Sequence, residues 1–219
     1  MVRTAETAMR LAARALSQPD TLGDADCEDL HGGLIGQPVN TATSIGYVAA
    51  GVWLLARTRR LPRGSRGVAG AYGAFVALSG AGSVAYHGPQ FAGAQLFHDL
   101  PIVGMLGLGL GVPVVRRFRG VPMIEGALGP RVWAAAGLGA AGGLAFLAGR
   151  TGAPTCDSGS VLQFHGLWHL CTAGAAGVWG TVLWPLPDPA EDRSSPAASE
   201  GAAAGAADGA AEDESGGGR

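Results

Sequence analysis

The chain has 219 residues, of which 47% are hydrophobic and only 15% are charged, and its formal net charge is −2 at pH 7. An ordinary soluble domain carries roughly 25% charged residues, so the composition argues against a surface that is fully exposed to water. The sequence contains 38 glycines and no lysine, so its 15 basic residues are all arginine. This bias toward Gly, Ala and Arg indicates a GC-rich bacterial genome.

The first 37 residues form an N-terminal segment ahead of the apolar part of the chain. Residues 4–17 predict a short amphipathic helix, and no apolar core with a cleavage site follows, so we expect no removable signal peptide. An acidic stretch comes next and ends before Pro38.

Five stretches are long and apolar enough to be predicted as membrane-spanning helices, each of which needs about 20 mostly apolar residues. Their many Gly, Ala, Ser and Thr residues allow membrane helices to approach closely. The predicted spans are residues 38–56, 67–86, 100–115, 132–148 and 164–184. We therefore expect an all-α fold, a polytopic membrane helical bundle of about five transmembrane helices, within one domain over residues 38–187.

The last section, residues 188–219, is a low-complexity acidic tail rich in Ala, Gly, Glu and Asp. Such a composition buries too little apolar surface to offset the entropy lost on ordering, so a disordered tail is expected.

Arginine is concentrated in two of the four connections between the predicted spans. Five arginines lie between residues 57 and 66, and four lie between residues 116 and 131, whereas the second connection has none and the fourth has only Arg150. The positive-inside bias makes the first and third connections cytoplasmic. We expect a bacterial plasma-membrane protein with its N-terminus outside and its acidic tail in the cytoplasm, although Arg3, Arg10 and Arg14 favour the opposite orientation. Topology already explains these arginines, so no nucleic-acid partner is expected.

This orientation gathers polar residues at the outer ends of three spans. The second span ends with Ser83 and His87, the third begins after His98 and Asp99, and the last begins with His165 and His169. Residues at i and i+4 share one helix face. Ionisable groups at membrane depth are costly, so a functional site is the first hypothesis.

Three imidazoles from two helices suit a tetrahedral Zn²⁺ that keeps its fourth position open. Such a metal lowers the pKa of water to about 7 and polarises carbonyls. Ser83 could donate to a developing oxyanion, and a carboxylate could accept and return a proton. The alternative is a purely structural role, in which each histidine is hydrogen-bonded and inert at the lipid–water boundary.

Three blocks of the sequence resemble the alkaline ceramidase family and the wider CREST superfamily of membrane hydrolases, which also includes the adiponectin and progestin receptors. The blocks are CEDLHGGLIGQPVNTATSIGYV, SVAYHGPQFAGAQLFHDLP and FHGLWHL, in the family's order. The resemblance implies Zn²⁺ held by His87, His165 and His169, with Ser83 and Asp99 as catalytic residues. It further implies a substrate within the bilayer, a lipid amide such as ceramide, cleaved to a fatty acid and an amine; a bacterial substrate could equally be another N-acyl lipid or an ester.

The chain departs from the family in three ways. Family members typically have seven spans, whereas five are predicted here. An ungapped count from His87 places the family's acid at His98, so His98 remains a rival to Asp99 as proton shuttle or extra ligand. The calcium site of animal members would use Asp24, Asp26, Glu28 and Asp29, but Gln37 stands where those enzymes have an acid. Calcium binding therefore stays open against a merely solvated acidic segment.

Cys27 and Cys156 both fall on the predicted outer face, where an oxidising compartment permits a disulfide. Such a bridge would tie the N-terminal segment over the site, although both cysteines could remain unpaired. Cys171 lies within the last span and is expected to be a buried, small apolar residue.

Two other functions remain open from the sequence. A receptor or scaffold with a structural zinc would use the same three histidines. A haem protein could use His87 with one histidine of the last span as axial ligands, but that role leaves Ser83 and Asp99 without a function.

Overall fold

The computed structural model describes residues 22–119 and 129–186, and all regular secondary structure in these two ranges is helical. The helices lie in one compact unit that ends at Trp184. The short helix expected over residues 4–17 and the tail expected over residues 188–219 lie outside the described residues.

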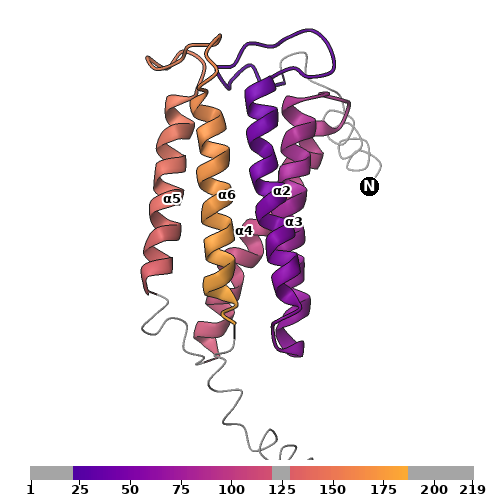
Figure 1. Cartoon of the computed structure of the whole chain (residues 1–219), viewed down its shortest axis with the longest axis vertical. Helices are drawn as coiled ribbons and strands as arrows, with labels where there is room; N and C mark the ends of the chain where they lie inside the picture. Colours follow the sequence, from indigo (N-terminus) through magenta and orange to yellow (C-terminus); the bar gives the residue numbers. More distant parts are fainter. Residues whose placement is uncertain (1–21, 120–128, 187–219) are drawn as a thin grey trace, which may run out of the picture. The chain divides into compact units, whose positions relative to one another are not determined.

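Five helices follow one another in the part of this unit that the structure describes (Figure 1). They are α2 (Pro38–Thr58), α3 (Arg63–His87), α4 (Ala94–Phe118), α5 (Gly129–Ala148) and α6 (Phe164–Leu183). The first begins with a proline, which suits a first helical turn because its missing N–H has no intrahelical partner there. The predicted helical bundle is therefore confirmed.

Four of the helices, α2 to α5, are long and apolar enough to cross a membrane. The fifth predicted span, α6, has 20 residues but does not belong to this group, because histidines and glycines lower its mean hydropathy. The structure thus supports a membrane-embedded protein in which four helices have the character of membrane spans, while α6 carries two histidines in its first turns.

Close helix contacts hold the bundle together. α2 packs against α3 and α6, while α5 packs on α6 and α4 on α3. Small residues make this possible: a Cβ on Gly80 would lie 2.6 Å from the backbone nitrogen of Val48 on α2. The buried core runs along α2, α3 and α6 and includes Tyr47, Leu54, Tyr72, Val76, Ala173 and Ala176.

The two ends of the bundle differ in chemistry. The C-terminal end of α3 and the N-terminal ends of α2, α4 and α6 meet at the upper end in Figure 1. At the other end, Arg57 Nη1 donates to the Trp184 carbonyl at 2.6 Å and Arg116 Nη1 to the Leu183 carbonyl at 2.5 Å. The arginines therefore satisfy carbonyls that the C-terminus of α6 leaves without helical partners.

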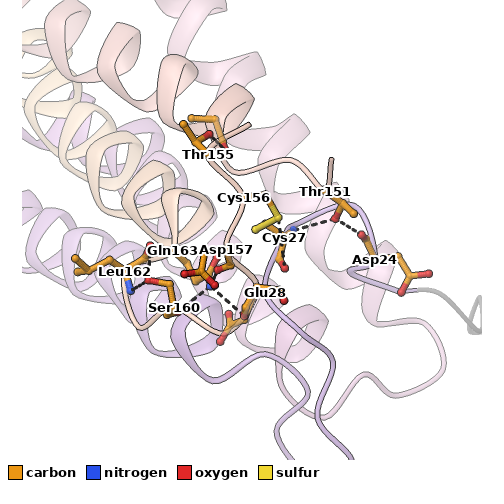
Figure 2. Close-up of a disulfide and its surroundings, with 12 residues drawn as sticks. Asp24, Cys27, Glu28, Thr151, Thr155, Cys156, Asp157, Ser160, Leu162 and Gln163 are labelled. Atoms are coloured by element: carbon orange, nitrogen blue, oxygen red, sulfur yellow. Dashed lines mark hydrogen bonds between the residues drawn. A yellow bond between two sulfur atoms is a disulfide. The ribbon is translucent and has the colours of Figure 1, made fainter. Parts of the chain in front are cut away.

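A disulfide joins Cys27 to Cys156, with Cα atoms 5.6 Å apart (Figure 2). It connects the segment of residues 22–37 to the loop of residues 149–163. Around it, the Cys27 amide donates to Thr151 Oγ1 at 3.1 Å and the Asp29 amide to the Ser158 carbonyl at 3.2 Å. These contacts fix the N-terminal segment across the upper end of the bundle, next to the start of α6.

Candidate metal centre

Three histidines converge at the upper end of the bundle. His87 is the last residue of α3, and His165 and His169 lie one turn apart at the start of α6; their exposed fractions are 1%, 3% and 1%. One ring nitrogen from each lies within 4.8 Å of the others, and among the described residues this is the one His, Cys, Asp and Glu group with such geometry. The structure thus brings the three predicted ligands together.

Hydroxyl groups on α2 determine which nitrogen of His169 carries the proton. Its Nδ1 lies 3.2 Å from Thr43 Oγ1 and 3.4 Å from Ser44 Oγ. Both hydroxyls donate their own protons to α2 carbonyls, Thr43 to Val39 at 2.8 Å and Ser44 to Asn40 at 2.6 Å. They can therefore only accept from His169, which places the proton on Nδ1 and leaves the Nε2 lone pair free.

His165 faces a buried carboxylate. Its Nδ1 lies 3.3 Å from Asp26 Oδ1, and Arg150 Nη1 approaches the same oxygen at 2.9 Å. Burial raises the pKa of Asp26 to about 6, an effect that the Arg150 guanidinium partly offsets. His165 Nδ1 makes no hydrogen bond among the described residues, so Asp26 is an electrostatic neighbour of the ring. A carboxylate in this position is a common outer partner of histidines in metal sites.

His87 provides the strongest indication of a ligand. Its Nδ1 lies 2.6 Å from Gln37 Oε1, whereas its Nε2 is fully buried and has no hydrogen-bond partner among the described residues. Unpaired buried nitrogens are rare in folded proteins. A cation bound between His87, His165 and His169 would satisfy this lone pair, so the donor set fits Zn²⁺.

Ser83 lies where the sequence predicted it, one turn before His87 on α3. Its Oγ is 2.8 Å from Ser44 Oγ and 3.3 Å from His169 Nε2, and the residue is 2% exposed. The hydroxyl therefore borders the group of histidine nitrogens and is shielded from water.

Asp99 does not reach the three histidines. Its side chain is 54% exposed, and its Oδ1 lies 2.7 Å from Nδ1 of the neighbouring His98, whose side chain is only 15% exposed. The ring of His98 packs on Tyr86 at 4.8 Å between centroids, and Tyr86 in turn packs on His87 at 4.9 Å. Of the two candidates, His98 is therefore the less exposed, and the Tyr86 ring connects it to His87.

Two of the four acidic residues that were predicted to bind calcium have other partners within the protein. Glu28 accepts the backbone N–H groups of Val39 and Asn40 at 2.7 and 2.8 Å, which caps the start of α2. Asp26 is bound to Arg150, and Asp24 and Asp29 do not join a convergent group in the described chain. The structure does not bring the four carboxylates together around one point.

An apolar pocket of about 650 Å³ adjoins the histidines and is lined by residues of all five helices. Trp168 and Thr172, which line it, flank His169 on α6. Tyr47, another lining residue, donates to Thr172 Oγ1 at 2.6 Å, and its ring centroid is 6.4 Å from that of His169. A hydrocarbon chain in this pocket would therefore end close to the three histidines.

Sequence reasoning missed the outer partners of the histidines, above all Gln37 and the Asp26–His165 contact. Two signals pointed to Gln37: it stands at the position of an acid in the enzymes that the sequence resembles, and it directly precedes Pro38 at the start of a helix.

No family model, no curated protein and no solved structure matches this chain.

Proposed function

We propose that the chain is a zinc-dependent membrane hydrolase that cleaves the amide bond of a lipid, such as ceramide or another N-acyl lipid. The observation that carries the proposal is the unpaired, buried Nε2 of His87 beside the rings of His165 and His169. Ser83 and the apolar pocket lie next to this group, as lipid hydrolysis requires.

His87, His165 and His169 would hold the zinc ion. When bound there, zinc supplies Lewis acidity that lowers the pKa of water and polarises a carbonyl group. Hydrogen bonds orient two of the imidazoles, with Nδ1 of His87 toward Gln37 and Nδ1 of His169 toward the α2 hydroxyls. Nδ1 of His165 faces Asp26 without a hydrogen bond. Ser83 donates a hydrogen bond to the substrate's carbonyl oxygen as negative charge develops on it.

Amide hydrolysis also needs a group that moves a proton. Water adds its oxygen to the carbonyl carbon, the C–N bond breaks, and a proton must reach the leaving nitrogen. We assign this transfer to His98: its Nδ1 faces Asp99, so its Nε2 is available to accept a proton from water and return it to the amine. Asp99 then acts by orienting the ring.

The pocket favours a lipid over a water-soluble amide. It lies among α2 to α6 with Ile102, Met105, Leu106 and Leu110 among its lining residues, so it can enclose an acyl chain. Tyr47 and Trp168 connect its wall to the histidines, and the scissile group of a lipid held there would lie at the centre.

A haem does not suit this site. The ring centroid of His87 lies 5.1 Å from that of His165 and 5.1 Å from that of His169. These separations leave no space for a porphyrin plane between two of the rings. A receptor or scaffold with a structural zinc would use the same ligands and differs in having no turnover.

The test uses full-length protein purified in detergent. Metal analysis is expected to find zinc, the visible spectrum to lack haem bands, and a panel of N-acyl lipids to be hydrolysed more rapidly than the matched esters. Zinc without turnover of any lipid would favour the receptor or scaffold, and the absence of zinc after purification without chelators would contradict the proposal.

A further inference from the structure

Gln37 and His87 are joined by two hydrogen bonds, one through the backbone and one through the side chains. The Gln37 amide N–H donates to the His87 carbonyl at 2.8 Å, and Gln37 Oε1 lies 2.6 Å from His87 Nδ1. Gln37 is completely buried. The start of α2 and the end of α3 are thus held together at the candidate metal ligand itself.

The orientation of the Gln37 amide is determined by its other neighbours. Its Nε2 donates both hydrogens to backbone carbonyls, those of Gly23 at 3.0 Å and Glu28 at 2.9 Å. Carbonyl oxygens can only accept. Turning the amide over would place Oε1 against two other oxygens, so Oε1 must face His87.

The surrounding segment leaves the amide no room to rotate. Gly23 has φ +89°, and a Cβ there would lie 2.9 Å from Gln37 Oε1, so this position requires glycine. Glu28 is anchored through its carboxylate to the first turn of α2, and Cys27 is anchored through the disulfide. The two carbonyls that hold the amide are therefore fixed in place.

We propose that Gln37 is a positioning residue that holds His87 in the tautomer with its proton on Nδ1 and its lone pair on Nε2. Because Oε1 only accepts, His87 Nδ1 must donate, and the remaining lone pair belongs to the buried nitrogen that has no partner. This inference rests on the metal site of the proposed function, and it adds the reason why His87 presents Nε2 to the ion.

The chain provides a matched control in Gln163. This glutamine precedes the first residue of α6 as Gln37 precedes that of α2, is 5% exposed, and donates to the carbonyls of Asp157, Ser158 and Ser160 at 3.0, 3.3 and 2.8 Å. Figure 2 shows its position beside the disulfide loop. Its hydrogen bonds stabilise a loop and involve no histidine, so Gln163→Leu tests the cost of losing a buried amide alone.

A second variant separates the effect of Gln37 on protein stability from its effect on the orientation of His87. Gln37→Glu keeps an acceptor for His87 Nδ1 but loses both donors to Gly23 and Glu28, so it is expected to lower the melting temperature while retaining zinc affinity. Gln37→Leu loses the acceptor as well. Zinc affinity of the full-length proteins is measured by competition with a chromogenic chelator.

We expect Gln37→Leu to bind zinc about 10–100-fold more weakly than the wild type, the usual effect of losing an outer partner. Gln37→Glu and Gln163→Leu are expected to keep the wild-type affinity despite lower melting temperatures. Wild-type affinity in Gln37→Leu, or a loss in Gln37→Glu as large as in Gln37→Leu, would overturn the inference.

The tautomer itself can be observed without zinc. Solid-state NMR of histidine-labelled, zinc-free wild-type protein is expected to show the His87 proton on Nδ1, assigned by its loss in His87→Asn. A proton on Nε2 would overturn the inference even if Gln37→Leu fails to fold. Wild-type protein that binds no zinc but shows the Nδ1 proton would contradict the proposed function and leave the role of Gln37 in orienting His87 intact.

Discussion

Ser44 Oγ on α2 and Ser83 Oγ on α3 lie 2.8 Å apart. The Ser44 proton is donated to the Asn40 carbonyl at 2.6 Å, and a hydroxyl has only one proton to donate. Ser83 is therefore the donor of the pair, so its proton points toward Ser44 and not toward His169 Nε2, which lies 3.3 Å from the Ser83 oxygen. To donate to a substrate, the Ser83 hydroxyl must turn from Ser44 toward the centre.

This relationship predicts the effect of Ser83→Ala. The variant is expected to retain zinc and lose amidase activity by roughly 10²–10³-fold, the effect of removing one oxyanion donor. Ser79→Ala is the control, because Ser79 is equally buried one turn earlier on α3 and donates to the Phe75 carbonyl. Full activity in Ser83→Ala, or equal losses in both variants, would contradict the role of Ser83.

Replacing the proposed zinc ligands is expected to change the zinc content of the protein. His165→Ala and His169→Ala are each expected to deplete zinc from about one ion per chain, since two imidazoles alone hold zinc weakly. His31→Ala, which changes an exposed histidine of the N-terminal segment, is expected to keep full occupancy. Metal analysis of the purified proteins measures the zinc content. Full zinc occupancy in the variant with both residues 165 and 169 replaced would disprove the site.

The exposure of Asp99 predicts that His98 is the more important of the pair. His98→Ala is expected to retain zinc and lose roughly 10²–10⁴-fold in rate, the contribution of a positioned proton carrier. Asp99→Asn is expected to lose less, because the asparagine oxygen still accepts a hydrogen bond from His98 Nδ1. If Asp99→Asn were inactive and His98→Ala active, the proton transfer would instead be assigned to Asp99.

Filling the pocket is expected to change substrate preference. Ala136 lines the pocket, whereas Ala134 lies on an exposed part of α5 outside it. Ala136→Trp should reduce turnover of long N-acyl chains more than of short ones, because the indole occupies hydrocarbon space. Competition between long- and short-chain substrates measures this, and an equal shift in Ala134→Trp would show that the pocket does not hold the chain.

Membrane orientation can be tested with the native disulfide intact. In a Cys171→Ala background, Ala92→Cys is expected to react with an impermeant maleimide on intact cells, and Gly64→Cys only after lysis. Both positions are exposed, and a Cβ at Gly64 meets no atom within 4 Å. The reverse pattern would mean that Arg3, Arg10 and Arg14 set the orientation and that the centre faces the cytoplasm.

The helices and the meeting of the three histidines could be predicted because both rest on regular properties of the sequence. Apolar length predicts the spans, and spacing at i and i+4 places His165 and His169 on one face of α6. Successive helices run in opposite directions, so the last residue of α3 and the first turn of α6 lie at the same end.

The outer partners could not be predicted in this way. Gln37 is 50 residues from His87 and, like Asp26, lies in a segment without helical or strand periodicity. The choice between His98 and Asp99 depends on the rotation of α4 about its axis, since neighbouring helical residues point about 100° apart. That rotation is set by packing, where Gly82 lies against the backbone of Phe97 and His98, and no sequence pattern encodes it.

The placement of two ligands on α6 has a consequence for biosynthesis. Since α6 follows the other four helices along the chain, His87 enters the bilayer well before the ribosome has made His165 and His169. A nascent chain that ends after α5 contains only His87 of the three candidate ligands and lacks Cys156, so neither a complete histidine site nor the disulfide can stabilise it. Insertion of α2 to α5 therefore depends on their apolar character and on helix packing, and the three histidines can meet only after α6 has joined the bundle.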